Sequence, residues 1–265
     1  MLIMYKNALE LGGSVVASSQ NVYFPASNIL SNLASDVWRS GATLATETLT
    51  ITLDRNYNNE TLYLVLHGFD FTHVTALTYQ LGALGAVPIV GYTNGVAFVT
   101  VIAVPAINEN TLVLTFTKDM AANYVQVGKI FIGNGFDNAP VDEPDKNGYH
   151  HEFYEGINKD YSIAGQKFSE GRYQSWHGSI DIPYIPDQVM HDTVRPWLQT
   201  VGTFQPFFIM VDNYANNGLG PEALASDQLA QVRYVTLSTV AKESFVFYGE
   251  LGYYWKLSLM LEEQL

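Results

Sequence analysis

Strict alternation of apolar and polar side chains is the feature that most constrains the fold of this chain. In the stretch 48–53, leucine or isoleucine occupies every second position and threonine the positions between. A period of two residues places the apolar side chains on one face of an extended strand. Turns rich in glycine, proline, asparagine and aspartate separate similar apolar runs at 61–67, 77–81, 87–90, 96–104, 111–117 and 124–132. About eight such strands predict an all-β jelly-roll sandwich over the first half of the chain.

The character of the sequence changes between residues 137 and 148. This stretch, DNAPVDEPDKNG, holds prolines and acidic residues and offers almost nothing to bury. We therefore predict a jelly-roll domain over residues 1–136, an acidic linker over 137–148 and a second β domain over 149–265. In the second domain, apolar residues at near-helical spacing predict one helix around Val189 to Leu198.

The charge balance and the absence of cysteine exclude several functions. The 265 residues include 13 Lys and Arg against 26 Asp and Glu, so contact with nucleic acid through a basic patch is not expected. Without cysteine there is no disulfide, thiolate nucleophile or cysteine-ligated metal. The most apolar window, 96–107, is too short for a membrane span. No Walker A loop, dinucleotide fingerprint or GxSxG elbow is present, and we expect neither a cofactor nor enzyme activity.

Two groups of residues have the composition of a metal or catalytic site without its spacing. His150 and His151 are adjacent, so on an extended segment their side chains point to opposite faces, and the HExxH pattern is absent. The acidic residues that a glycosidase would need on rigid elements gather instead in the predicted linker. We interpret both groups as solvated and predict no metal site.

The segment 14–39 predicts a loop packed over one end of the sandwich. A short β-branched stretch leads into FPASNIL, where a Ser–Asn pair after the proline can cap one helical turn. Trp38 and Arg39 close the segment. They could form a ligand platform, with the ring stacked on a sugar and the guanidinium bonded to it. They could also be structural anchors, with Trp38 filling the sandwich end and Arg39 bonding nearby carbonyls, and the apolar neighbours favour this interpretation.

Both halves of the sequence resemble phage proteins. The order ASS, FPASNIL, DVWR resembles the first third of the discoidin-like (galactose-binding-like) jelly roll, especially the version found in tail proteins of long-tailed bacteriophages. A Gly–Arg strand, a helix with a central tryptophan, a Pro–Phe step and the final WKLSLMLEE resemble the β-sandwich-plus-helix module of phage distal-tail and minor-tail proteins, related in fold to tail-tube proteins. The resemblances imply a virion protein of the tail tip or baseplate, assembled in the host cytoplasm, that links the tail tube to tip proteins. They also imply Trp197 as the anchor of the helix and Trp255 as the anchor of the closing strand.

The aromatic content also predicts contacts between copies of the chain. Few charges and many aromatic residues leave more apolar surface than two small domains need, which is typical of interfaces. The closing strand 253–261 is the expected participant, with Tyr253 and Tyr254 as candidate contacts. The resemblance to distal-tail proteins implies a ring of six copies, with three as the alternative.

The alternative function is a carbohydrate-binding module that recognises a glycan of the host cell surface. Its binding loops would be 68–73, 82–87 and 107–110 of the jelly roll. These loops are mostly small, apolar or singly charged, which weakens this hypothesis. A glycan-processing enzyme is a third hypothesis. The candidate glycan-binding residues are Phe69, Asp70, Phe71 and His73.

Overall fold

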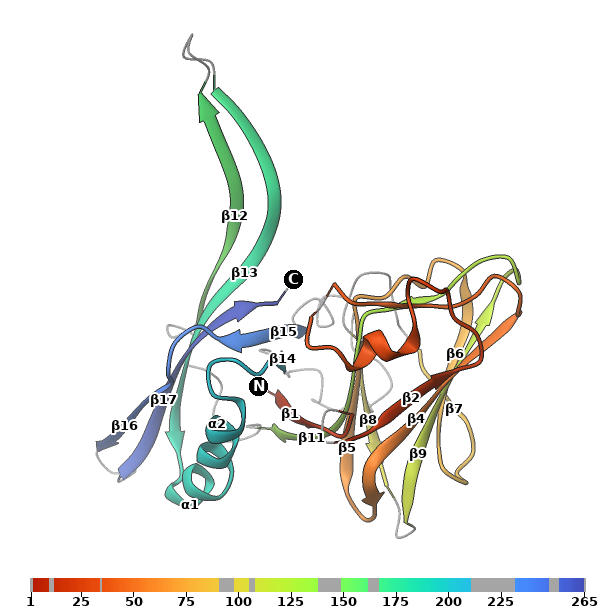
Figure 1. Cartoon of the computed structure of the whole chain (residues 1–265). Helices are drawn as coiled ribbons and strands as arrows, with labels where there is room; N and C mark the ends of the chain where they lie inside the picture. Colours follow the sequence, from red (N-terminus) through yellow and green to blue (C-terminus); the bar gives the residue numbers. More distant parts are fainter. Residues whose placement is uncertain are drawn as a thin grey trace. The chain divides into compact units, whose positions relative to one another are not determined.

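The computed structural model shows two compact units built almost entirely of β-strands, and its described residues add a short 3-10 helix in the first unit and one longer helical segment in the second (Figure 1). The all-β fold with one helix, predicted from the alternation of side chains, is confirmed. The structure describes residues 2–9, 12–33, 35–90, 98–104, 108–137, 149–161, 167–210, 232–247 and 253–264.

The chain passes between the two units more than once. The first unit comprises residues 1–137 and 207–234, and the second comprises residues 138–206 and 235–265. The division near residue 137 lies where the sequence changes character, but residues 207–234, which we had placed in the second domain, belong to the first unit. Residues 138–148 of the predicted linker lie outside the described residues.

The first unit is a sandwich of two antiparallel sheets. One sheet has the order β2-β4-β9-β6-β7, the other contains β14-β1-β11-β5-β8, and β3 pairs with β10. The elements are β1 (Leu2–Asn7), β2 (Ser14–Ala17), the 3-10 helix η1 (Ala26–Leu30), β3 (Trp38–Arg39), β4 (Thr46–Tyr57), β5 (Thr61–His67), β6 (Val74–Leu81), β7 (Val87–Pro88), β8 (Phe98–Ala103), β9 (Glu109–Lys118), β10 (Gln126–Val127), β11 (Lys129–Asp137) and β14 (Phe207–Met210).

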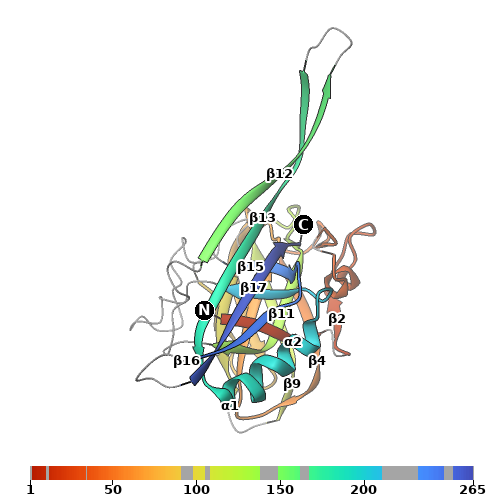
Figure 2. The ribbon, with the colours of Figure 1, turned by 90° about the vertical axis from the view of Figure 1, so that its left-hand side faces the viewer.

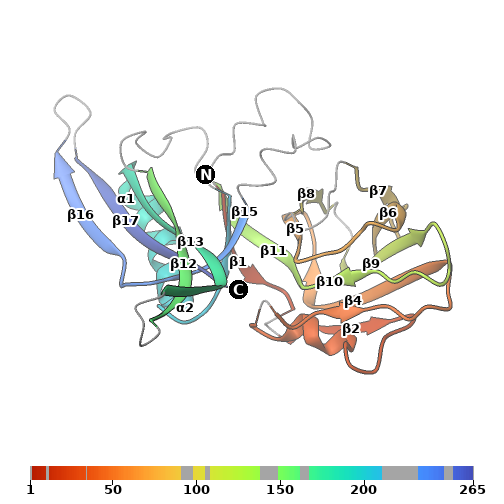
Figure 3. The ribbon, with the colours of Figure 1, turned by 90° about the horizontal axis from the view of Figure 1, so that it is seen from above.

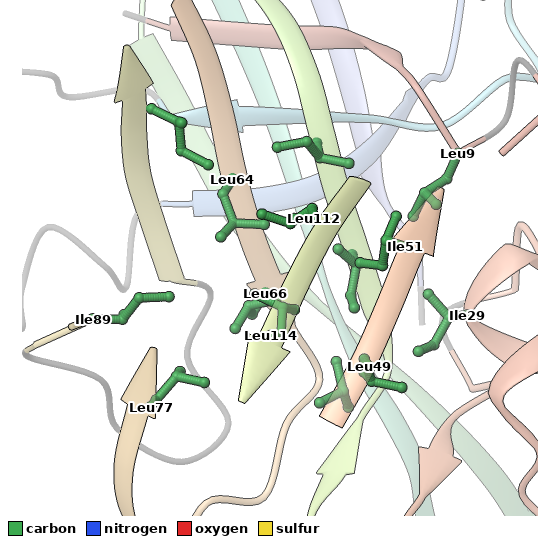
Figure 4. Packing of buried hydrophobic residues seen from close by; sticks show 14 of the residues in the cluster. Leu9, Ile29, Leu49, Ile51, Leu64, Leu66, Leu77, Ile89, Leu112 and Leu114 are labelled. Atoms are coloured by element: carbon green, nitrogen blue, oxygen red, sulfur yellow. The ribbon is translucent and has the colours of Figure 1, made fainter. Parts of the chain in front are cut away.

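The sandwich core forms where the apolar positions of the alternating strands face each other. Leu49 and Ile51 of β4 and Leu114 of β9 are buried against Leu64 and Leu66 of β5, as Figure 4 shows. The threonines between the leucines of β4 lie on the opposite face of the strand. Burial of these side chains is the main stabilising contribution to the sandwich.

The sheet that contains β5 is buried on its second face as well. Leu2 and Met4 of β1, Val65 of β5 and Phe208 of β14 belong to a separate apolar cluster. β14 reaches this cluster by pairing with β1 in the register Leu2↔Met210. The first unit therefore needs a strand from the second half of the sequence to cover its N-terminal strand.

Strand register assigns each loop to one of two ends of the sandwich. β6 starts at Val74 opposite Lys118, and its last residue, Leu81, pairs with Leu112. The loops 18–37, 68–73 and 119–125 therefore lie at what we call the Lys118 end. The segments that follow Leu81 and precede β9 lie at the opposite end. The predicted glycan loops 68–73 and 82–87 are thus at different ends, so they do not form one surface.

The second unit is built around β17, which has neighbours on both edges. β17 pairs with β13 on one side and with β15 and β16 on the other, and Figure 3 shows β16 beside β17. β17 therefore has no free edge with which to pair with another copy of the chain. The predicted ring of copies stays a prediction. The strands are β12 (Tyr149–Tyr161), β13 (Lys167–Ile185), β15 (Val232–Leu237, whose first three residues belong to the first unit), β16 (Lys242–Phe247) and β17 (Tyr253–Glu263).

The helical segment and a long hairpin complete the second unit. The helix runs through α1 (Asp187–Val189), a π-helical turn (Met190–Val194) and α2 (Arg195–Val201), and matches the predicted position. β12 and β13 form a two-stranded ribbon (Figure 2), and β17 pairs only with the part of β13 from His177 onward. The described residues contain no helix long and apolar enough to cross a membrane.

Candidate functional site

A buried ion pair holds together the loops of the Lys118 end. The ammonium of Lys118 lies 3.1 Å from Glu47 Oε1, and both side chains are completely enclosed. Ser18 and Ser19 donate hydrogen bonds to the other oxygen of the carboxylate, at 2.7 and 2.6 Å. Because a buried charge is costly unless it is fully paired, this network fixes the surrounding backbone.

Lys118 also binds three backbone carbonyls. Its Nζ donates to the carbonyl oxygens of Gly41, Ala121 and Asn123, at 3.2, 3.2 and 2.8 Å. These residues come from two separate loops. The ammonium therefore positions the loop 119–125 on the end of the sandwich.

Arg39 contacts two aromatic rings at this end. Its guanidinium carbon is 4.4 Å from the ring centroid of Phe24 and 4.5 Å from that of Tyr124, and its Nη2 donates to Gln126 Oε1 at 2.6 Å. Two cation–π contacts thus hold the guanidinium. Arg39 bonds a side-chain amide, whereas we had expected it to bond carbonyls. One face of the Tyr124 ring is occupied by Arg39, and the side chain remains 39% exposed.

A network of polar side chains joins the loop that carries Tyr124 to the loop 68–73. His73 Nδ1 is 3.0 Å from Asp119 Oδ2, and Asn123 donates to Asp119 Oδ1 at 2.8 Å. The hydrogen bonds from Asn123 and from His73 hold the pKa of the Asp119 carboxyl below its usual value. Asp70 is joined to this loop by the backbone, since its N–H donates to the carbonyl of Gln126 at 3.0 Å.

The predicted glycan-binding residues separate into two groups. Phe69 and Phe71 are buried in the sandwich core and stack on each other with ring centroids 4.3 Å apart, so they are not available to a ligand. Their loop turns its aromatic side chains inward because Phe71 also packs on Phe116. Asp70 and His73 remain at the surface, where Asp70 accepts hydrogen bonds from the backbone and hydroxyl of Thr72.

The four predicted anchors differ in burial. Trp38 is fully buried, packs on Phe116 and donates from its ring nitrogen to the carbonyl of Ser19 at 3.2 Å. Trp197 is buried on α2. Trp255 is only partly buried, and its ring nitrogen donates to Asp187 Oδ1 at 2.7 Å.

The two predicted oligomer contacts lie on opposite faces of β17. Tyr253 is 64% exposed and stacks on Phe245 of β16 with ring centroids 5.3 Å apart. Tyr254 is partly buried and meets Tyr184 edge to face. Both side chains thus have a contact within the chain, and their role as contacts between copies stays a prediction.

Sequence reasoning missed Tyr124, Asp119 and Asn123. All three lie in a short turn after β9, and the composition of a turn does not tell which of its side chains reach the surface. The buried pair did leave a signal. Glu47 lies on the buried face of β4, two residues from Leu49. Lys118 lies on the buried face of β9, two residues from Phe116. A charge at an apolar position of an alternating strand indicates a buried partner of opposite charge.

No protein-family model matches the chain, and no curated protein sequence matches it. Among solved structures, similar ones include chitosan-binding module 1 of a chitosanase/glucanase from Paenibacillus sp. IK-5, with 15% identity and a TM-score of 0.38 over 49% of this chain and 100% of the module. A family 32 carbohydrate-binding module of Clostridium perfringens NanJ, in complex with galactose, has 11% identity and a TM-score of 0.34 over 48% of this chain and 97% of the module. These values are low, so we base the functional proposal on the chain's own residues.

The comparisons contradict the predicted role in a bacteriophage tail. The similar structures are carbohydrate-binding modules, including the third family 32 module of a C. perfringens family 31 glycoside hydrolase, with 15% identity and a TM-score of 0.36 over 49% of this chain and 94% of the module. The prediction of a distal-tail or baseplate component is therefore wrong, and the findings agree better with the alternative hypothesis.

Proposed function

We propose that this protein is a carbohydrate-binding module without catalytic activity of its own, and that it binds a glycan at the Lys118 end of the first unit. The observation that carries the proposal is the half-exposed ring of Tyr124, held by Arg39 on one face and preceded in the same loop by the polar residues Asp119 and Asn123. No cofactor is part of the proposal.

The chemistry of the loop matches the two kinds of surface that a sugar presents. A pyranose has an apolar face of C–H groups, which packs well on an aromatic ring, and a rim of hydroxyls that both donate and accept hydrogen bonds. Tyr124 offers the ring. Asp119 offers an acceptor, while His73 and Asn123 offer a mixed set of donors and acceptors. These groups are already oriented by bonds to one another, so little side-chain entropy is lost when a ligand binds.

The state of Asp119 supports binding rather than hydrolysis. A glycosidase needs a carboxylic acid with a raised pKa that can donate a proton to the leaving group. The hydrogen bonds from Asn123 and His73 shift the pKa of Asp119 in the opposite direction. Asp119 therefore stays ionised near neutral pH and acts as a hydrogen-bond acceptor.

Replacement of Tyr124 by alanine is expected to weaken glycan binding about tenfold, because the stacking surface is lost. Titration calorimetry of the full chain measures this. The probes are galactose, chitotriose and GlcNAc-α-1,4-galactose, which are the ligands present in similar structures.

Two matched variants serve as controls. Tyr124→Phe keeps the ring and its contact with Arg39, so it should bind nearly as well as the wild type. Phe247→Ala removes an exposed ring in the second unit and should have no effect at this site. If none of the probes binds, or if Tyr124→Ala binds as tightly as the wild type, the proposal is wrong.

A further inference from the structure

A groove in the second unit lies between α2 and the turn that joins β15 to β16. Its volume is about 340 Å³, which is within the range of small-ligand sites. Side chains of α2 form one wall and residues of the β15–β16 connection form the other. We call it the α2 groove, and its lining includes Arg195, Gln199, Thr203, Leu237, Val240 and Glu243.

The charges in the α2 groove neutralise each other. Arg195 donates from Nε and Nη2 to Glu243 Oε2, both at 3.0 Å, so the cation of one wall is paired with the anion of the other. The guanidinium also lies 4.6 Å from the ring centroid of Trp255. A groove with a paired cation and anion gives no net attraction for an ionic ligand, so its charge complements a neutral one.

Two polar side chains of the groove have hydrogen-bonding capacity to spare. The amide of Gln199 and the hydroxyl of Thr203 are exposed, and neither has a hydrogen-bond partner among the residues that the structure describes. An amide and a hydroxyl supply both donors and acceptors, as hydroxyl groups of a ligand require. Leu237 and Val240 provide an apolar surface opposite them.

An exposed aromatic ring lies at the rim of the groove. Phe204 is 79% exposed, an unusually high value for phenylalanine. Gly202 lines the groove and has φ of +53°, and a Cβ built there would lie 3.0 Å from Cε1 of Phe204. The Phe204 ring therefore rests against Gly202, next to the groove, and its exposure is fixed by a turn that favours glycine.

We propose that the α2 groove is a second carbohydrate site that takes a neutral pyranose, with Phe204 packing on the apolar face of the sugar and with Gln199 and Thr203 bonding its hydroxyls. This inference shares its ligand class with the proposed function but uses different residues in a different unit.

The test isolates the α2 groove by working in the full chain with Tyr124→Ala. Methyl galactoside, methyl glucoside and N-acetylglucosamine are titrated and followed by saturation-transfer NMR and by tryptophan fluorescence, because Trp255 contacts Arg195 of the groove. At least one probe should bind. Adding Phe204→Ala should weaken that binding about tenfold, and Gln199→Ala should also weaken it.

Control variants separate a binding role from a general effect. Phe204→Trp keeps an aromatic ring at the rim and should bind at least as well as the parent, while Phe247→Ala should bind as the parent does. Glucuronic acid, which is anionic, should bind no better than methyl glucoside.

The outcomes distinguish this inference from the proposed function. If Phe204→Ala alone abolishes binding and Tyr124→Ala does not weaken it, the α2 groove is a glycan site and the proposed site in the first unit is wrong. If the Tyr124→Ala chain binds none of the probes, or binds them with unchanged affinity when Phe204 and Gln199 are replaced, the inference of a second site is overturned.

Discussion

Replacing Lys118 by methionine is expected to lower the free energy of unfolding of the first unit by about 3–5 kcal/mol. Methionine has a similar length but cannot donate hydrogen bonds. The change leaves the Glu47 carboxylate enclosed with no positive partner and removes the bonds from Lys118 to the carbonyls of Gly41, Ala121 and Asn123. An uncompensated buried charge costs far more than the pair contributes.

Denaturant unfolding of the wild type, of Lys118→Met and of one double variant measures this effect. The double variant Lys118→Met, Glu47→Leu removes both charges, so it should be clearly more stable than Lys118→Met alone. Lys118→Met should also weaken glycan binding beyond its effect on folding, because the ammonium positions the loop that carries Tyr124. A loss below about 1 kcal/mol for Lys118→Met would show that the pair does not hold this end together.

Acidification from pH 6.5 to pH 4 is expected to destabilise the first unit by roughly 3 kcal/mol through His67 alone. Burial lowers the pKa of His67 from 6.5 to about 4, and the positive charges of Arg233 and Lys129 lower it further in the same direction. The ring packs beside Phe208 and Tyr234.

The direction of the effect follows from the two pKa values of His67. Because the imidazole is harder to protonate in the folded state, the unfolded chain binds the additional proton in this pH window. The stability is therefore complete above pH 6.5 and is lost as the pH falls towards 4.

The variant His67→Phe isolates the contribution of His67 from that of the carboxyl groups. It keeps an aromatic ring beside Phe208 but has no proton to bind. The free energy of unfolding is measured for both proteins at intervals between pH 7 and 4. The value for the wild type minus that for the variant should fall by roughly 3 kcal/mol over this range. A difference that stays constant over this range would contradict a depressed pKa for His67.

Local patterns predicted the strands well because the alternation of apolar and polar residues lies within each strand's own sequence. The alternation of Leu49 and Ile51 with threonine is enough to orient β4, and the spacing of apolar residues predicted the helix around Val189 to Leu198. Partners distant in sequence leave no such trace. Nothing in residues 207–210 indicates pairing with β1, which lies about two hundred residues earlier.

The candidate site was predicted only in part, because the sequence does not tell in which direction the side chains of a loop point. Asp70 and His73 were named together with Phe69 and Phe71, yet the latter two point into the core. A loop has no fixed period, so composition does not tell which of its residues face solvent. The role of Tyr124 depends on Arg39, which lies 85 residues earlier in the sequence and is brought to it by the pairing of β3 with β10.

The pairing of β1 with β14 has a consequence for how the chain folds as it is made. At roughly 5–20 residues per second, β14 leaves the ribosome on the order of 10–40 s after β1. β11 is made much earlier than β14 and can pair with β1 at that time, so the sandwich core can form before β14 is present. Until Phe208 has been made, the sheet face that carries Leu2, Met4 and Phe131 remains uncovered. Nascent chains arrested between residues 137 and 207 should therefore present an apolar sheet face to chaperones, and arrest beyond residue 234 should remove it.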